Sequence, residues 1–256
     1  MNSSKSVAKP LLEEGAVPQS EEAWSECADC PLRDYRFCAA YTRTMPNAAP
    51  RLPRLAKDVV PRQNLYRAKE PIRQVALVRE GMAFRYVLLP DGNRQILSFC
   101  LPGDFLIPSV TVRDTVHFSV QALTPMRLCV FDKEAFRAHV AEDRHAMMSM
   151  AEICIGEKEN CEARIVDLGR RGSEERVARF ILDLMSEMQR RDPVKHASIS
   201  FPMRQQHIAD ALGLTQVHVS RVLGRFRKEG LISLAGGTLA IIDAPNLQNL
   251  AGGQRD

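Results

Sequence analysis

The chain has 256 residues, of which 45% are hydrophobic, so it is long enough for two domains that each bury a core. Its 35 basic and 31 acidic residues give a net charge of +4, which is too small to identify a partner by itself. No long apolar run occurs, which argues against a signal peptide and a membrane span, and we expect a cytoplasmic protein without a membrane partner. In a reducing compartment, its seven cysteines are more often ligands, redox sensors or buried apolar residues than disulfides.

The N-terminal part of the chain combines a polar segment with a cysteine motif. Residues 1–26 are polar and aperiodic, and we expect them to be disordered. Residues 27–62 hold the cysteine motif and a proline-rich connection, in which a long regular helix is not expected. The run CADCPLRDYRFC spaces Cys27, Cys30 and Cys38 as C-x2-C-x7-C, which allows three thiolates to converge on one soft metal centre. A fourth ligand has to come from elsewhere.

Residues 63–140 show short alternating strands separated by turn signals, such as the Pro-Asp-Gly-Asn run at 90–93. This pattern predicts a small antiparallel β-barrel or jelly roll, which we interpret as a sensor domain. In the run MRLCVF the apolar residues alternate, so Cys129 points away from the core, toward a surface on which the cysteine segment can lie. Cys100 is a rival for the role of fourth ligand, because it also faces away from its apolar neighbours along the strand.

A long helix is predicted over residues 141–171. One of its faces repeats in steps of four and three residues and is apolar except for Lys158, which suits the seam of a two-fold dimer. The alternative is that this face packs on the barrel and that Lys158 extends to solvent. The predicted dimerisation residues are Met147, Ala151, Cys154, Lys158, Cys161, Ile165 and Leu168.

Residues 172–245 have the pattern of a winged helix-turn-helix domain. Gly213 marks a tight turn between two short helices, and Thr215 is a suitable N-cap for the second helix. A hairpin turned at residues 236–237 follows as the wing, and residues 246–256 are predicted to be a flexible tail. The buried stripe of the second helix is predicted to be Val219, Val222, Leu223 and Phe226.

The opposite face of that second helix is polar and basic, as a surface that meets DNA should be. Arg221 is the best candidate to read a guanine edge, and residues further along the helix are suited to phosphates. The alternative is an ordinary solvated helix face. The predicted DNA-contacting residues are Val217, His218, Ser220, Arg221, Arg225 and Lys228.

The chain resembles the Crp/Fnr family of transcription regulators, and specifically its oxygen-responsive Fnr and FixK branch, over about residues 27–245, most strongly in the run LGLTQVHVSRVLGRF. The resemblance implies an α+β fold with an N-terminal barrel of the cyclic-nucleotide-binding type, a long dimerisation helix and a C-terminal winged helix-turn-helix. It also implies a sequence-specific homodimer that binds a two-fold symmetric operator and contacts RNA polymerase. One departure is Val217, which stands where the family usually has a glutamate and suits a thymine methyl rather than a cytosine.

For the cofactor, the resemblance implies an oxygen-labile 4Fe-4S cluster bound by Cys27, Cys30, Cys38 and Cys129, with control by oxygen or redox state. Two other interpretations stay open. The same four thiolates suit a closed tetrahedral zinc site, or Cys129 and Cys100 are buried small residues and the N-terminal cysteines bind nothing. A regulator without a cluster would respond to thiol oxidation, zinc or a small ligand in the barrel.

Two further functions are not expected. Cyclic-nucleotide sensors hold the ribose with a Gly-Glu pair and the phosphate with an arginine, but the run PGDFLIPSVTVRDTVHFSV has no such pair, and Arg113 lacks the expected setting. We therefore expect no cyclic nucleotide. We also expect no enzyme, because the sequence lacks a Gly-rich phosphate loop, an H-E-x-x-H motif and a nucleophile elbow.

Overall fold

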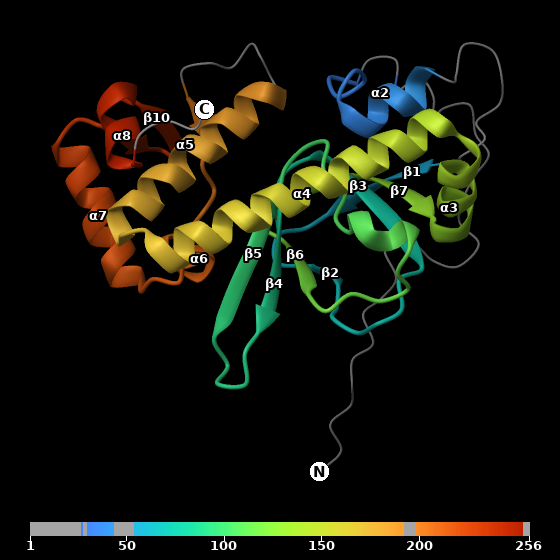
Figure 1. The fold of residues 1–256 in the computed structure, drawn as a ribbon, viewed down its shortest axis with the longest axis horizontal. Helices are drawn as coiled ribbons and strands as arrows, with labels where there is room; N and C mark the ends of the chain where they lie inside the picture. The colour runs from blue at the N-terminus through green and yellow to red at the C-terminus, as the bar shows by residue number, and fades with distance from the viewer. Residues whose placement is uncertain (1–26, 28–29, 44–53, 192–197, 253–256) are drawn as a thin grey trace. The chain divides into compact units, whose positions relative to one another are not determined.

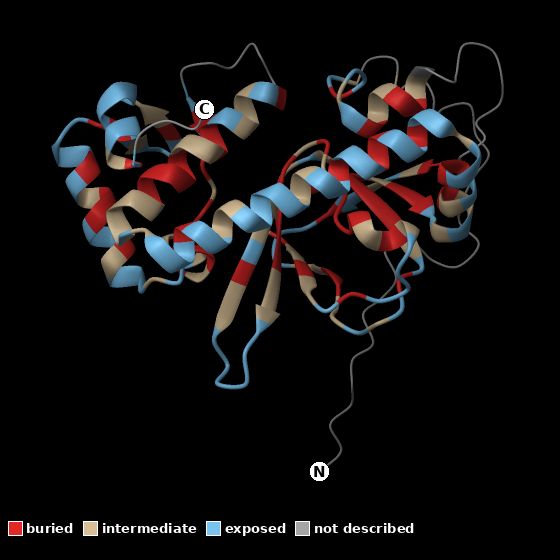
Figure 2. Cartoon of the chain, in the orientation of Figure 1, coloured by how far each residue is buried: buried red, intermediate tan, exposed pale blue. Residues whose placement is uncertain are grey.

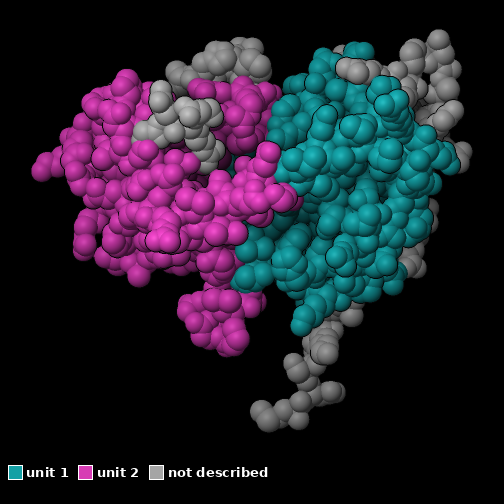
Figure 3. All heavy atoms as spheres, in the orientation of Figure 1, with its two compact units in different colours: residues 1–87, 97–156 teal, residues 88–96, 157–256 magenta. Residues whose placement is uncertain are grey.

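The computed structural model describes residues 27, 30–43, 54–191 and 198–252 of the chain. The chain consists of two compact units, residues 1–87 with 97–156 and residues 88–96 with 157–256 (Figure 3). The disorder predicted for residues 1–26 lies outside the described residues, as do residues 44–53 of the proline-rich connection and the end of the predicted tail. No helix in the described ranges is long and apolar enough to cross a membrane.

Two antiparallel sheets form most of the first unit (Figure 1). Their strands are β1 (Arg54–Val59), β2 (Asn64–Tyr66), β3 (Gln74–Glu80), β4 (Ala83–Leu88), β5 (Arg94–Cys100), β6 (Ser119–Ala122) and β7 (Met126–Asp132). One sheet has the order β1-β7-β3 and the other β2-β6-β4-β5, and the tip of the β4–β5 hairpin, residues 88–96, belongs to the second unit. The predicted barrel is thus a pair of sheets that share one core, and no strand pairing between them closes a ring in the described residues.

Strand β7 follows the predicted alternation. Met126, Leu128 and Val130 are buried in the core, whereas Cys129 between them lies on the other face of the sheet. Alternation of this kind follows from the two-residue period of a strand. The prediction that Cys129 points away from the main core is confirmed.

The sheet begins earlier than the sequence pattern indicates. Strand β1 starts at Arg54, inside the 27–62 range that was assigned to the cysteine motif and a connection rather than to the barrel. The prolines at 53 and 61 suggested irregular chain, but both positions fall outside the bounds of the strand. A proline disrupts a strand chiefly in its interior, so the prolines flank β1 instead of preventing it.

Helices complete the first unit. They are α2 (Arg36–Arg43), the 3-10 turn η1 (Pro108–Thr111), α3 (Lys133–Glu142) and α4 (Arg144–Arg170), and the boundary between the units falls within α4. The long helix predicted over 141–171 is α4, which begins only after Asp143, because the Asp143 carboxylate accepts the backbone N–H groups of His145 and Ala146 at 2.8 and 3.1 Å. Residues 141–142 end α3 instead.

The second unit contains the predicted winged helix-turn-helix. Its elements are α5 (Ser173–Arg191), β8 (Ile199–Ser200), α6 (Gln205–Leu212), α7 (Gln216–Lys228), β9 (Ile232–Ala235), β10 (Thr238–Ile241) and α8 (Ala244–Leu250). The strands form a small sheet in the order β8-β10-β9. Gly236 and Gly237, both at positive φ, turn the β9–β10 hairpin as predicted.

The prediction of a flexible tail from residue 246 is wrong for the described part of that segment. Residues up to Leu250 belong to α8, whose N-cap Asp243 accepts a hydrogen bond from the Asn246 backbone N–H at 3.1 Å. Leu247 is fully buried, and the Ala251 carbonyl accepts a hydrogen bond from Arg179 of α5 at 3.2 Å. The cap and these contacts with α5 hold the helix in place.

Candidate nucleic-acid interface and cysteine pocket

Helix α7 has the buried stripe and exposed face that its periodicity predicts. At the turn before it, Gly213 adopts a left-handed conformation with φ of 61°, and the Thr215 hydroxyl accepts the His218 backbone N–H at 3.2 Å. Arg176 of α5 donates to the Leu212 carbonyl at 2.8 Å and so holds the C-terminal end of α6 against α5. The stripe residues Val219, Val222, Leu223 and Phe226 are each at most 3% exposed.

The outer face of α7 is open. Five of the six predicted DNA-contacting residues are exposed, namely Val217, Ser220, Arg221, Arg225 and Lys228. Val217 is 69% exposed, although it is apolar. Within the described part of the chain, no hydrogen bond or ion pair engages the Arg221 guanidinium. Val217 and Arg221 therefore lie one helical turn apart, with both side chains open to a partner.

Helix α5 contacts two of the six predicted DNA-contacting residues, His218 and Arg225. The half-buried His218 ring places Nε2 at 2.8 Å from the Ser173 hydroxyl. The Arg225 guanidinium contacts both carboxylate oxygens of Glu174 at 2.7 Å and Glu229 at 2.7 Å. These contacts position α7 on α5 and compensate part of the basic charge of the face.

The four predicted metal ligands line one pocket in the first unit. Hydrogen-bonded turns bring the N-terminal three together, with the Cys30 N–H donating to the Cys27 carbonyl at 3.3 Å, and Cys38 lies in α2. Cys129 faces the same pocket from β7. The pocket, including its open mouth, measures about 470 Å³. Cys100, the rival ligand, is 1% exposed in the core and does not line it.

The charge state of the Cys129 and Cys38 thiols depends on what occupies the pocket. Burial raises the pKa of the Cys129 thiol to about 11, against the opposing effect of the Arg54 guanidinium. Burial, followed by the charges of Cys129, Cys30 and Cys27, raises the pKa of Cys38 further. Without a bound cation these thiols therefore stay protonated at neutral pH. Among the described residues, no three His, Cys, Asp or Glu side chains are grouped closely enough to hold a single metal ion.

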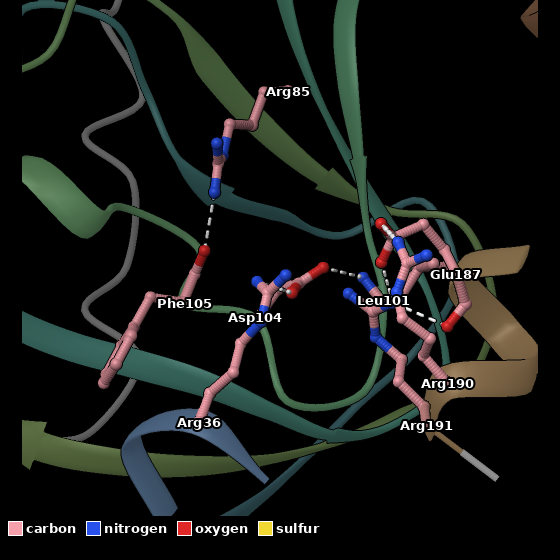
Figure 4. A network of polar contacts seen from close by, with 8 residues as sticks. All are labelled: Arg36, Arg85, Leu101, Asp104, Phe105, Glu187, Arg190 and Arg191. Carbon is pink, nitrogen blue, oxygen red and sulfur yellow. Dashed lines mark hydrogen bonds and ion pairs between the residues drawn. The ribbon is translucent and has the colours of Figure 1, made fainter. Parts of the chain in front are cut away.

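The cysteine segment is docked on the first unit by rings and one ion pair. The Phe37 ring packs edge-on against Phe105, with centroids 5.0 Å apart. Arg36 and Asp104 form an ion pair at 3.4 Å, which is drawn in Figure 4. Gly103 has φ of 91°, and a Cβ there would lie 2.5 Å from the Tyr35 ring. These contacts, made by three consecutive residues between Cys30 and Cys38, thus hold the segment in place.

One buried polar residue of the first unit, Arg85, was not predicted from the sequence. Arg85 is only 6% exposed, and its guanidinium donates to the Leu106 carbonyl at 2.9 Å. It also donates to the Phe105 carbonyl at 2.6 Å (Figure 4). It also lies over the Phe118 ring at 5.7 Å. Arg113, in contrast, is exposed. An arginine at an inward position of β4 was the available signal, but a strand pattern alone does not show its partners.

The predicted dimerisation face of α4 is exposed in the single chain (Figure 2). Ile165 is 69% exposed and Met147 49% exposed, whereas Ala146 and Ile153 on a different face are buried in the core of the first unit. The part of the seam that belongs to the first unit, Met147, Ala151 and Cys154, is thus exposed rather than packed on the described sheets of that unit. Lys158 pairs with Glu162 one turn away at 2.5 Å, while Cys154 and Cys161 are exposed.

Comparison with known proteins identifies the family. Residues 56–143 match the cyclic nucleotide-binding domain family, and residues 175–250 match the Crp-like helix-turn-helix domain family. The chain is 32% identical to the nitrogen fixation regulation protein FixK of Bradyrhizobium diazoefficiens, over 88% of this chain and 93% of the relative. The chain belongs to the Crp/Fnr family. The fold class and the family that the sequence indicated are thereby confirmed.

Other members support the same assignment of this Crp/Fnr chain. It is 25% identical to the transcriptional activator protein FnrL of Cereibacter sphaeroides, over 90% of this chain and 93% of FnrL. The solved structure of FixK2 from Bradyrhizobium japonicum matches with a TM-score of 0.70 and 27% identity, over 79% of this chain and 98% of FixK2. This Crp/Fnr protein is a DNA-binding transcription regulator and not an enzyme.

Proposed function

We propose that this regulator responds to oxygen or redox state through a 4Fe-4S cluster held by Cys27, Cys30, Cys38 and Cys129. The observation that carries the proposal is the convergence of these four side chains, from two distant parts of the chain, on one pocket. Four cysteines are the usual donor set for such a cluster, and the pocket also contains the cationic Arg54. When bound, the cluster supplies the redox chemistry with oxygen, while the protein supplies ligands and surroundings.

The residues around Cys38 are placed to transmit the state of the pocket. The neighbouring Phe37 packs on Phe105, and both belong to the core that includes Ala146 and Met150 of α4. A bound Cys38 holds Phe37 in this packing. When Cys38 is no longer bound, α2 can shift. Because the core is close-packed, the side chains around α4 then rearrange.

The proposed output is DNA binding by a homodimer formed through α4. Its exposed seam carries apolar side chains, among them Met147, Ile165 and Leu168, that a second copy would cover. Two-fold pairing gives two α7 helices for the two half-sites of a symmetric operator. Similarity to the transcriptional activator protein FnrL and to the transcriptional activatory protein AadR of Rhodopseudomonas palustris favours activation, with RNA polymerase as a further partner.

On each half-site, α7 is proposed to read bases through its open residues. The Arg221 fork matches the two major-groove acceptors of guanine, and Val217 suits a thymine methyl. Ser220 and Lys228, on the same exposed face, are suited to the DNA backbone.

The cluster is tested on protein purified without oxygen, by absorption spectroscopy with iron and sulfide analysis. We expect brown protein with about four irons and four sulfides per chain, which bleaches in air. Cys129→Ser should lose the iron, whereas the control Cys161→Ser, on the exposed seam, should keep it. Colourless wild-type protein would contradict the cluster but not DNA binding. The regulatory signal would then be zinc, thiol oxidation or a small ligand in the barrel.

A further inference from the structure

The cysteine pocket contains a buried cation that the sequence analysis did not predict. Arg54 is the first residue of β1 and only 3% exposed. In the antiparallel register it pairs with Phe131 of β7, while Ala56, two residues on, pairs with Cys129. Because side chains two residues apart share a face of a strand, Arg54 and Cys129 project from the same face of the sheet. Arg54 therefore lines the pocket beside Cys129 and is shielded from solvent.

The Arg54 guanidinium contacts sulfurs from both halves of the ligand set. Its Nη1 donates to Cys129 Sγ at 3.7 Å, and its side chain also forms a hydrogen bond with the Cys27 side chain. Cys27 belongs to the N-terminal segment and Cys129 to the sheet. One planar group thus joins the segment to the sheet at the sulfur atoms themselves.

A buried guanidinium is unfavourable unless negative charge lies beside it. Neutral thiols do not supply that charge, whereas thiolates bound to a metal group do. The surroundings of Arg54 are therefore best satisfied when Cys27 and Cys129 act as ligands. Arg79, which also lines the pocket, adds a second positive charge near Cys129.

We propose that Arg54 is a positioning residue that donates to the sulfurs of Cys27 and Cys129 and prolongs the lifetime of the iron–sulfur group in air. The inference rests on the proposed function of the four cysteines. Hydrogen bonds and positive charge at ligand sulfurs disfavour the loss of an electron from a sulfur-ligated centre to oxygen. Arg54 also keeps Cys27 near Cys129, so that the ligand set does not open at that side.

The test compares Arg54→Met, which keeps an unbranched side chain but removes the charge and the donors, with Arg54→Lys, which keeps the charge but replaces the planar two-armed donor by a single ammonium. The matched control is Arg127→Met, because Arg127 lies on the same strand as Cys129 but does not line the pocket. Each protein is purified without oxygen and exposed to air, and visible absorbance and acid-labile sulfide are followed with time. Circular dichroism before exposure verifies that each variant is folded.

We expect Arg54→Met to bleach about tenfold faster than wild type, or to retain no cluster while folded, because partners of metal ligands commonly have effects of that size. Arg54→Lys should also bleach faster than wild type, since one ammonium does not reach both sulfurs, and Arg127→Met should match wild type. If Arg54→Met does not fold, Arg54→Lys decides the question. Wild-type rates in the folded Arg54 variants would overturn the role of Arg54 alone, whereas iron-free wild type would overturn the cluster proposal and this inference together.

Discussion

Arg221 and Arg225 lie one turn apart on the exposed face of α7, but the chain already engages only one of them. Arg225 is held by Glu174 and Glu229, whereas no described residue engages Arg221. An arginine that is already paired gains less from a new phosphate, because it first has to leave its carboxylates. The two residues should therefore contribute differently to DNA binding.

We expect Arg221→Ala to reduce the preference for the guanine-containing operator by about 1 to 3 kcal/mol, because a bidentate base contact is lost. Arg225→Ala is the matched control and should weaken binding less, without changing which base is preferred. Fluorescence anisotropy titrations with the operator and its single-base variants, at one salt concentration, measure both effects. Equal losses of specificity in the two variants would contradict this assignment of Arg221.

The open residues of α7 could be predicted from its sequence, because the 3.6-residue period separates Val217 and Arg221 from the buried stripe. The contacts of His218 with Ser173 and of Arg225 with Glu174 could not. They join residues that are 45 and 51 positions apart in the chain, and they depend on how α5 packs against α7. Local periodicity contains no information about that packing.

At the scale of elements, the same contrast holds for the pocket. The alternation of apolar residues along β7 was sufficient to predict that Cys129 points away from the core. The place of Arg54 beside it depends on the antiparallel register between β1 and β7, which are far apart in the chain. Helix α8 is a different case, because Asp243 followed by Pro245 is a helix-start signal that is visible in the sequence itself.

The docking of the cysteine segment should depend on Gly103. Gly103→Ala adds a methyl group against the Tyr35 ring at a positive φ, whereas Gly92→Ala is a matched control with a similar φ of 83° and no neighbouring atom within 4 Å. We expect Gly103→Ala to lower the free energy of unfolding by about 1 to 3 kcal/mol more than the control, and to lower the iron content. Urea denaturation followed by circular dichroism measures the difference. Equal losses would show that the Tyr35 contact does not stabilise the fold.

For the whole molecule, two sequence periods were sufficient to indicate the main elements of secondary structure. Alternation with period two indicated the sheets, and the 3.6-residue period indicated α4 and the winged helix-turn-helix. Both were confirmed, together with the Crp/Fnr family. The proposed link between pocket and DNA involves a second copy of the chain, which a single sequence does not contain. In that proposal the second copy covers the exposed seam of α4.

The central claim is that the occupied cysteine pocket controls DNA binding, and the most direct measurement is operator affinity before and after exposure of anaerobically purified protein to air. At one fixed salt concentration, we expect wild-type protein to lose about tenfold or more in affinity, which is a typical coupling between two sites. Cys129→Ser should bind weakly under both conditions. Equal affinity of iron-loaded wild-type protein before and after bleaching would contradict the account.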